Sequence, residues 1–188
     1  LINKKKNYTA AFTYKNKYKF YSISNVKAFH ITDKYDPEIY DIVISCVGPN
    51  ECYKIADKIK NAKLVISCEN DPETVNQLKK LSGNKNIFFG IPDVITSNTA
   101  PKKLLKKDKL IVISEVGKLI VNGNLKLPKP IINVGDKGII KHWRCKLLIH
   151  NAPHAIIAYL GHLKKYEFIH QAMNDSEIKK IVQGAMNE

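Results

Sequence analysis

The sequence predicts an α/β fold, in which a partial doubly wound sheet is followed by the start of a mostly helical domain. Within residues 41–89, apolar runs typical of strands alternate with loops and with segments of helical spacing, the pattern of a doubly wound sheet. After residue 130 the apolar residues recur at helical spacing instead. The lysine- and proline-rich stretch 125–130 separates the two patterns, so we predict domains at 1–125 and 126–188.

The N-terminal forty residues are polar and predict short strands. Residues 8–14 and 17–23 are rich in aromatic and β-branched residues, so we expect two strands with Asn16 in the turn between them. Residues 26–31 predict a third strand.

The doubly wound part begins with two largely apolar runs, 41–47 and 63–68, which are typical of parallel strands buried on both faces. The segment 51–61 predicts a helix. A second helix is expected at 72–81, with Asp71 as its N-cap. Further strands are predicted at 86–89, 109–114 and 118–121, the last two as an antiparallel edge.

The carboxyl ends of the two buried strands are the expected ligand-binding rim, because ligands of doubly wound sheets bind outside those ends. This places Val47, Gly48 and Pro49 after the first strand and Glu69 and Asn70 after the second. On the pattern alone, an ordinary strand-to-helix turn at Gly48-Pro49 and a turn or cap residue at Asn70 are the favoured interpretation.

Four helices are expected after the boundary, with Ser176 as the N-cap of the last, at 136–149, 152–164, 165–173 and 176–187. Pro153 disfavours helix at the preceding residue, and Asn151 is a good N-cap. We therefore expect a helix break near Asn151.

Three polar residues lie around this break, in a segment with apolar flanks. Lys146 is followed by Asn151 after five residues and by His154 after three more. A desolvated lysine can act as a general base, an asparagine amide can donate to a developing oxyanion, and a histidine can orient a hydroxyl. Alcohol oxidation is the chemistry that they could share. The alternative is a surface lysine, a simple cap and a core histidine.

Residues 146–163, with Lys-x4-Asn-x2-His followed by Ala-Ile-Ile-Ala-Tyr-Leu-Gly-His-Leu, resemble the long-chain polyol dehydrogenase (mannitol dehydrogenase) family. Residues 166–175 resemble its mannitol 1-phosphate branch. The resemblance implies a Rossmann-type dinucleotide-binding domain, NAD as cofactor, and interconversion of mannitol 1-phosphate and fructose 6-phosphate.

Roles for individual residues follow from the same resemblance. It implies that Lys146 is the general base, that Asn70 and Asn151 steady the oxyanion, and that His154 orients the substrate. It places Val47, Gly48, Pro49, Glu69 and Asn70 beside the nicotinamide, and it implies no metal.

The sequence departs from the family in two places. Ser97 and Asn98 stand where the family has Asp-Arg, and no G-x-G-x-x-G loop occurs. Because the family also has sequence on both sides of this segment, we expect the chain to be a fragment or truncated product that binds NAD weakly. A free-polyol or hexuronate dehydrogenase, and an inactive module that keeps the fold for binding, are the alternatives. The choice between NAD and NADP and the oligomeric state stay open.

The composition excludes little by itself. The net charge of +14 would suit nucleic acid, but Arg144 is the one arginine, and arginine is the main base-reading residue. We therefore expect no specific nucleic-acid binding. No run of about 18 apolar residues predicts a membrane span. Cys46, Cys52, Cys68 and Cys145 lack CxxC spacing, so we expect reduced structural thiols in a cytoplasmic protein.

Overall fold

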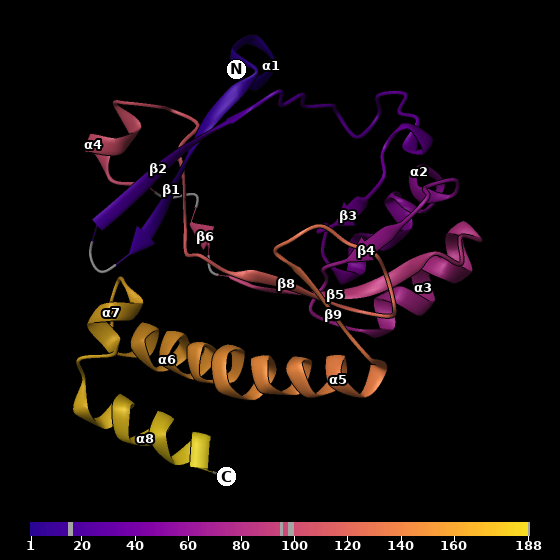
Figure 1. Cartoon of the computed structure of the whole chain (residues 1–188). Coiled ribbons are helices and arrows are strands. Elements are labelled where there is room, and N and C mark those ends of the chain that lie inside the picture. Colours follow the sequence, from indigo (N-terminus) through magenta and orange to yellow (C-terminus); the bar gives the residue numbers. More distant parts are fainter. Residues whose placement is uncertain (15–16, 95, 98–99, 188) are drawn as a thin grey trace. The chain divides into compact units, whose positions relative to one another are not determined.

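The computed structural model describes residues 1–14, 17–94, 96–97 and 100–187. The chain divides into two compact units, Leu1–Val134 and Gly135–Glu188, and Figure 1 shows the elements of each. Residues 131–134 belong to the first unit, as the last strand of its five-stranded sheet. The domain boundary that we expect after residue 125 stays a prediction.

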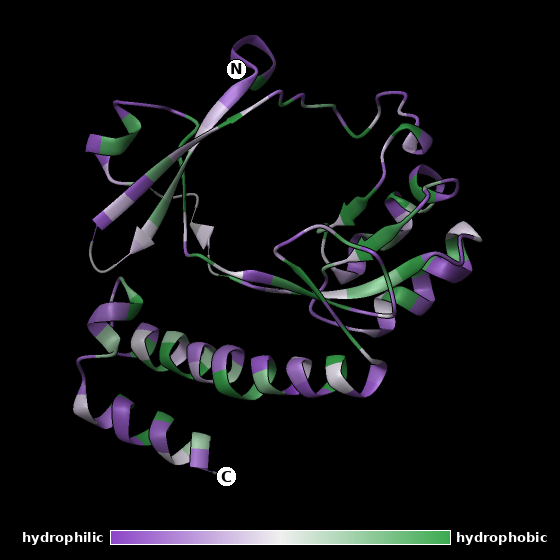
Figure 2. Cartoon of the chain, viewed as in Figure 1, coloured by the Kyte–Doolittle hydropathy of each residue, from purple (hydrophilic) through white to green (hydrophobic). Residues whose placement is uncertain are grey.

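A five-stranded sheet forms the larger part of the first unit, in the order β3-β4-β5-β8-β9. Strands β3 (Val43–Ser45), β4 (Val65–Ser67) and β5 (Ile87–Asp93) are parallel. Figure 2 shows the hydrophobic character along β3 and β4. Burial on both faces, predicted for both strands, is confirmed for β4 and wrong for β3, where Ile44 is 51% exposed. The predicted α/β class, with parallel strands in the first part of the chain, is confirmed.

The prediction that 109–114 and 118–121 form an antiparallel edge is wrong, because the two segments do not pair with each other. Strand β8 (Lys118–Asn122) pairs antiparallel with β5 and parallel with β9 (Ile131–Val134). Strand β7 (Val112–Ser114) belongs to the other sheet. The reason is that β5 continues through Asp93, beyond the four residues predicted, and so offers β8 a backbone edge with which to pair.

The helices of the first unit pack on the parallel strands. The 3₁₀ helix η2 (Pro49–Lys54) and α2 (Ala56–Ile59) occupy the place of the single helix predicted at 51–61. Helix α3 (Glu73–Ser82) confirms the next prediction, and Asp71 caps it by accepting a hydrogen bond from the Glu73 amide at 2.9 Å. The shared core consists of Cys52, Ile55, Ile59, Ala62, Val65, Leu78 and Ile87.

A four-stranded sheet has the order β2-β1-β7-β6. Strands β1 (Asn7–Tyr14) and β2 (Lys17–Ser24) confirm the first two predicted strands, whereas the turn at Asn16 lies outside the described residues. The strand predicted at 26–31 is wrong. The backbone of this segment pairs with a side chain instead of a strand. The Asn3 amide group accepts a hydrogen bond from the Ala28 N–H at 2.6 Å and donates one to the Ala28 carbonyl at 2.7 Å.

Asp108 fixes the second sheet, together with the short helices α1 (Ile2–Lys5) and α4 (Lys102–Leu105). Its carboxylate accepts from the Thr9 amide at 2.8 Å, the Leu110 amide at 3.0 Å and the Lys5 ammonium at 3.0 Å. Burial would raise the pKa of Asp108, but these hydrogen bonds lower it to about 2.

The second unit is helical. It contains α5 (Asp136–Cys145), a π-helical segment η3 (Lys146–Asn151), α6 (Ala152–Leu163), α7 (Ile169–Ala172) and α8 (Ser176–Asn187). Buried residues of the last three helices form its core, namely Ile157, Ala172, Ile178 and Val182. Among the helices of the described ranges, none has both the length and the apolar content for a membrane span.

The helix break predicted near Asn151 is wrong. Asn151 has helical dihedral angles (φ −72°, ψ −45°), and its side chain forms no capping hydrogen bond. The Ala152 amide donates instead to the Leu147 carbonyl, five residues back. A wider π turn therefore carries the helix from α5 into Pro153, rather than ending before it.

Candidate active site

The carboxyl end of the parallel sheet is organised around Glu69, a buried carboxylate at the end of β4 that is 5% exposed. Its Oε1 accepts from the Ser45 hydroxyl at 2.8 Å and the Val47 amide at 2.9 Å, and its Oε2 accepts from the Gly48 amide at 2.8 Å. Hydrogen bonds to a charged acceptor are among the stronger ones. Glu69 therefore holds the loop after β3 in place, from the neighbouring strand.

The loop that Glu69 holds presents apolar groups outward. Val47 is 39% exposed, Pro49 is exposed, and Gly48 has φ +93°, a conformation that L side chains rarely adopt. The amides of Val47 and Gly48 already donate to Glu69, and a proline has no amide proton. Val47, Gly48 and Pro49 thus offer an apolar surface, and their backbone amides are either bound to Glu69 or lacking, so these three residues do not suit a phosphate.

Asn70 is exposed and directly follows Glu69. It lies at the same end of the parallel sheet as Val47, Gly48 and Pro49, so the structure brings the five predicted rim residues together at one edge. The predicted pairing of Asn70 with Asn151 joins residues of different units and stays a prediction.

The predicted residues of the second unit coincide with the π-helical segment. Lys146 is its first residue and Asn151 its last. In a π turn the backbone hydrogen bond runs over five residues, so residues five apart are stacked one turn from each other. His154 lies three residues into the α-helical continuation, again about one turn on. The π turn therefore brings Lys146, Asn151 and His154 toward one side of the helix.

The exposure of this segment differs from the sequence-based expectation. Lys146 and Asn151 are half-buried, and His154 is exposed. The apolar flank is itself exposed, with Leu148 at 62% and Ile149 at 54%. The three polar residues thus lie beside an open apolar surface of this unit rather than in an enclosed pocket.

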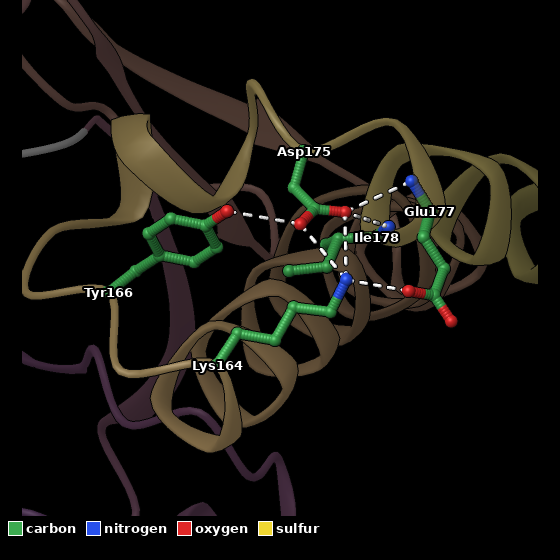
Figure 3. Close-up of polar contacts among 5 residues, drawn as sticks. All are labelled: Lys164, Tyr166, Asp175, Glu177 and Ile178. Atoms are coloured by element: carbon green, nitrogen blue, oxygen red, sulfur yellow. Dashed lines mark hydrogen bonds and ion pairs between the residues drawn. The ribbon is translucent and has the colours of Figure 1, made fainter.

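A network of charged groups fixes the helices that follow (Figure 3). Asp175 accepts from the Glu177 and Ile178 amides at 3.0 and 3.1 Å, so it caps α8 in place of Ser176, the predicted cap. The Lys164 ammonium contacts Glu177 at 2.6 Å and Asp175 at 2.9 Å. These carboxylates raise the pKa of Lys164 well above its usual range.

Asp175 is equally constrained by its partners. The Ile178 amide and the Lys164 ammonium lower its pKa to about 2, and the Tyr166 hydroxyl donates to it at 3.1 Å. The network joins the end of α6 to the start of α8, so it stabilises the end of the helix that carries His154.

The structure describes two further sequence predictions only in part, namely the departure at Ser97-Asn98 and the absence of a metal site. Ser97 lies in β6 (Thr96–Ser97), opposite Ile113 of β7, and Asn98 lies outside the described residues. Among described residues, no group of three or more His, Cys, Asp or Glu side chains is arranged to hold a metal ion.

Solved structures place this architecture in a known fold class. A ketopantoate reductase from Staphylococcus aureus matches 96% of the chain with a TM-score of 0.59 and 14% identity, and the match covers 64% of that protein. A 2-dehydropantoate 2-reductase from Geobacter metallireducens matches 95% of the chain with a TM-score of 0.59 and 15% identity, over 60% of its length. These likenesses concern the fold alone, and they confirm the predicted Rossmann-type class.

Sequence comparison then confirms the resemblance to the mannitol dehydrogenase family. Residues 139–188, which include Lys146, Asn151 and His154, match the sequence model of the mannitol dehydrogenase C-terminal domain. A mannitol-1-phosphate 5-dehydrogenase from Buchnera aphidicola is 29% identical over 90% of the chain and 52% of its own length. One from Thermoanaerobacter pseudethanolicus is 28% identical over 88% and 50%. The chain spans about half the length of these curated relatives.

Two structural features of the site were missed by sequence reasoning. The π turn was missed because a 3.6-residue period was assumed throughout the helix. The positioning role of Glu69 was missed because its partners are a hydroxyl and two amides on another strand. The one available signal was an acidic residue directly after an apolar strand, since a carboxylate there needs donors when it is buried.

Proposed function

We propose that this chain provides the hydride-transfer site of an NAD-dependent polyol-phosphate dehydrogenase, acting between mannitol 1-phosphate and fructose 6-phosphate in the cytoplasm. The observation that supports it most is the π turn, which brings Lys146, Asn151 and His154 to one side of a single helix. The relatives named mannitol-1-phosphate 5-dehydrogenase support the reaction and the substrate class.

The proposed roles follow from the chemistry of each side chain. Oxidation of the alcohol removes a proton from oxygen and a hydride from carbon. The Lys146 amine takes the proton as general base, the amides of Asn70 and Asn151 donate to the developing oxyanion, and the His154 ring orients the hydroxyl. A bound NAD supplies the chemistry of hydride acceptance.

The rim fits the ring end of such a cofactor. The exposed side chains of Val47 and Pro49 provide an apolar contact beside Gly48. Because the amides of Val47 and Gly48 donate to Glu69, these residues fit a nicotinamide ring better than a pyrophosphate. In this proposal Glu69 positions the loop, and its carboxylate does not itself contact the cofactor.

The first test is turnover by the whole chain, measured as NADH absorbance with fructose 6-phosphate. Lys146→Ala should lower turnover about 10²–10⁴-fold, the usual contribution of a general acid–base group, while NADH binding by fluorescence is retained. Lys141→Ala removes an exposed lysine of α5 and is the matched control. Equal turnover by the Lys146→Ala variant and its control would reject the general-base assignment.

A second test addresses the π turn directly. Deleting Leu148, which is 62% exposed, leaves the number of residues that an ordinary α-helical ladder needs in that turn. We expect helix content by circular dichroism and turnover both to stay close to those of the unchanged chain, because Lys146 and Asn151 are then four residues apart, one turn of an α-helix, and remain on one side. A fall in turnover to the level of Lys146→Ala would contradict the argument that a common side of the helix is what these three residues need.

Substrate preference separates this proposal from the nearest alternative. A dehydrogenase of the phosphorylated polyol should turn over fructose 6-phosphate and not fructose, whereas the reverse order indicates a free-polyol or hexuronate enzyme. NADH binding without turnover of any sugar would instead indicate an inactive binding module.

A further inference from the structure

Two thiols from neighbouring strands lie at the carboxyl edge of the parallel sheet. Cys46 follows β3 and Cys68 follows β4, and the preceding residues Ser45 and Ser67 are paired in parallel register. The Cys68 amide donates to the Ser45 carbonyl at 2.9 Å, so the register continues to the two cysteines. Neighbouring strands lie about 4.8 Å apart and residues in register share a face, which is within the Cα separation that a disulfide spans.

The neighbouring strand leaves room for the second sulfur. Phe89 of β5 pairs with Ser67, so Gly90 lies beside Cys68. A Cβ atom at position 90 would lie 3.2 Å from the Cys68 Sγ. The glycine therefore provides space over β5 in which the Cys68 thiol can lie, on the same face as Cys46.

The two thiols differ in access and interact with each other. Cys46 is exposed and Cys68 is partly buried. A hydrogen bond from Cys68 lowers the pKa of Cys46 to about 7, against the opposing effects of burial and of the Glu69 carboxylate. Burial raises the pKa of the Cys52 thiol. Cys46 is thus the accessible nucleophile, and Cys68 is within reach to react second.

We propose that Cys46 and Cys68 form a redox-active dithiol that a small disulfide such as glutathione disulfide closes to an intramolecular disulfide. The Cys46 thiolate attacks one sulfur of the oxidant, forming a mixed disulfide and releasing one glutathione thiolate. The Cys68 thiol loses its proton and attacks the Cys46 sulfur, which releases the second glutathione. The protein loses two electrons and two protons, and one glutathione disulfide becomes two glutathione molecules.

The site lies next to the rim residues Val47, Gly48, Glu69 and Asn70, so its effect on catalysis rests on the proposed function. If that function holds, oxidation should lower turnover, because the new bond joins the segments on both sides of the rim. The formation of the bond itself does not depend on any enzymatic activity.

The test exposes the reduced full chain to a series of glutathione redox buffers and maps disulfides by non-reducing peptide mass spectrometry. We expect a Cys46–Cys68 peptide pair with the loss of two hydrogens. Cys68→Ala should trap the intermediate, seen as one glutathionyl group on Cys46. Cys145→Ser removes the exposed thiol of the other unit and should leave the Cys46–Cys68 bond unchanged.

The pH dependence of alkylation is a second measurement, and nonspecific oxidation would not reproduce it. Cys46 should react with iodoacetamide with a midpoint near pH 7, and the midpoint should rise in the Cys68→Ala variant because the hydrogen bond from Cys68 is lost. Glutathione attached to Cys46 in the wild-type chain without closure, or oxidation confined to Cys145, would overturn the proposal. If the disulfide forms in a chain that shows no turnover, the redox-active dithiol is supported and the proposed dehydrogenase function is rejected.

Discussion

Replacing Glu69 with glutamine tests whether this carboxylate holds the rim loop. The side chain is 5% exposed and accepts three hydrogen bonds, from the Ser45 hydroxyl and the amides of Val47 and Gly48. A glutamine keeps one oxygen and places an amide group where the other oxygen was, so at least one N–H or O–H donor faces another donor. Loss of a hydrogen bond to a charged acceptor costs about 1.5–3 kcal/mol.

That cost should appear as faster opening of the loop. At about 1.4 kcal/mol per tenfold change, the opening constant should rise about 10- to 100-fold, read as faster hydrogen exchange of the Val47 and Gly48 amides. Glu115→Gln is the matched control, since Glu115 is exposed. If exchange in Glu69→Gln stays within about twofold of this control, the reasoning from burial and hydrogen bonding is refuted.

For three further substitutions, the structure predicts whether the stability of the protein rises or falls. Because the pKa of Asp108 lies at about 2, below the ordinary 3.8, its stabilisation is present above pH 4 and is lost as the pH falls toward 2; in urea unfolding, Asp108→Asn should flatten that acid dependence. Gly161→Ala places a Cβ 2.7 Å from the Ala172 Cβ and should destabilise the second unit by about 1–3 kcal/mol. Gly184→Ala meets no atom within 4 Å and should stabilise its helix by about 0.5–1 kcal/mol; Trp143 fluorescence reports both glycine variants.

Patterns of apolar residues correctly predicted the strands and helices that depend on neighbouring residues in the sequence. The apolar runs at 41–47 and 63–68 give β3 and β4, and the spacing after Asp71 gives α3. The strand expected at 26–31 failed because the backbone there is bound by Asn3, a residue 25 positions away from Ala28. The sequence pattern of residues 26–31 could not predict this. A strand pattern describes the alternation of side chains, and it does not show that a distant side-chain amide forms hydrogen bonds with the same backbone groups.

The residue types and spacing pointed to a candidate site, whose roles stay a prediction, but not to its geometry. The types and spacing of Lys146, Asn151 and His154 suggested shared chemistry, but a period of 3.6 residues separates Lys146 from Asn151 by roughly 140° around the helix. A hydrogen bond over five residues brings them nearly into line instead. The sequence contains a proline at 153, which a sequence-based analysis interprets as a break. The helix continues through it, and the wider turn that precedes the proline places the three residues toward one side of the helix. The deletion of Leu148 therefore separates two explanations that a substitution cannot, since it removes the π turn while keeping the proposed residues one helical turn apart.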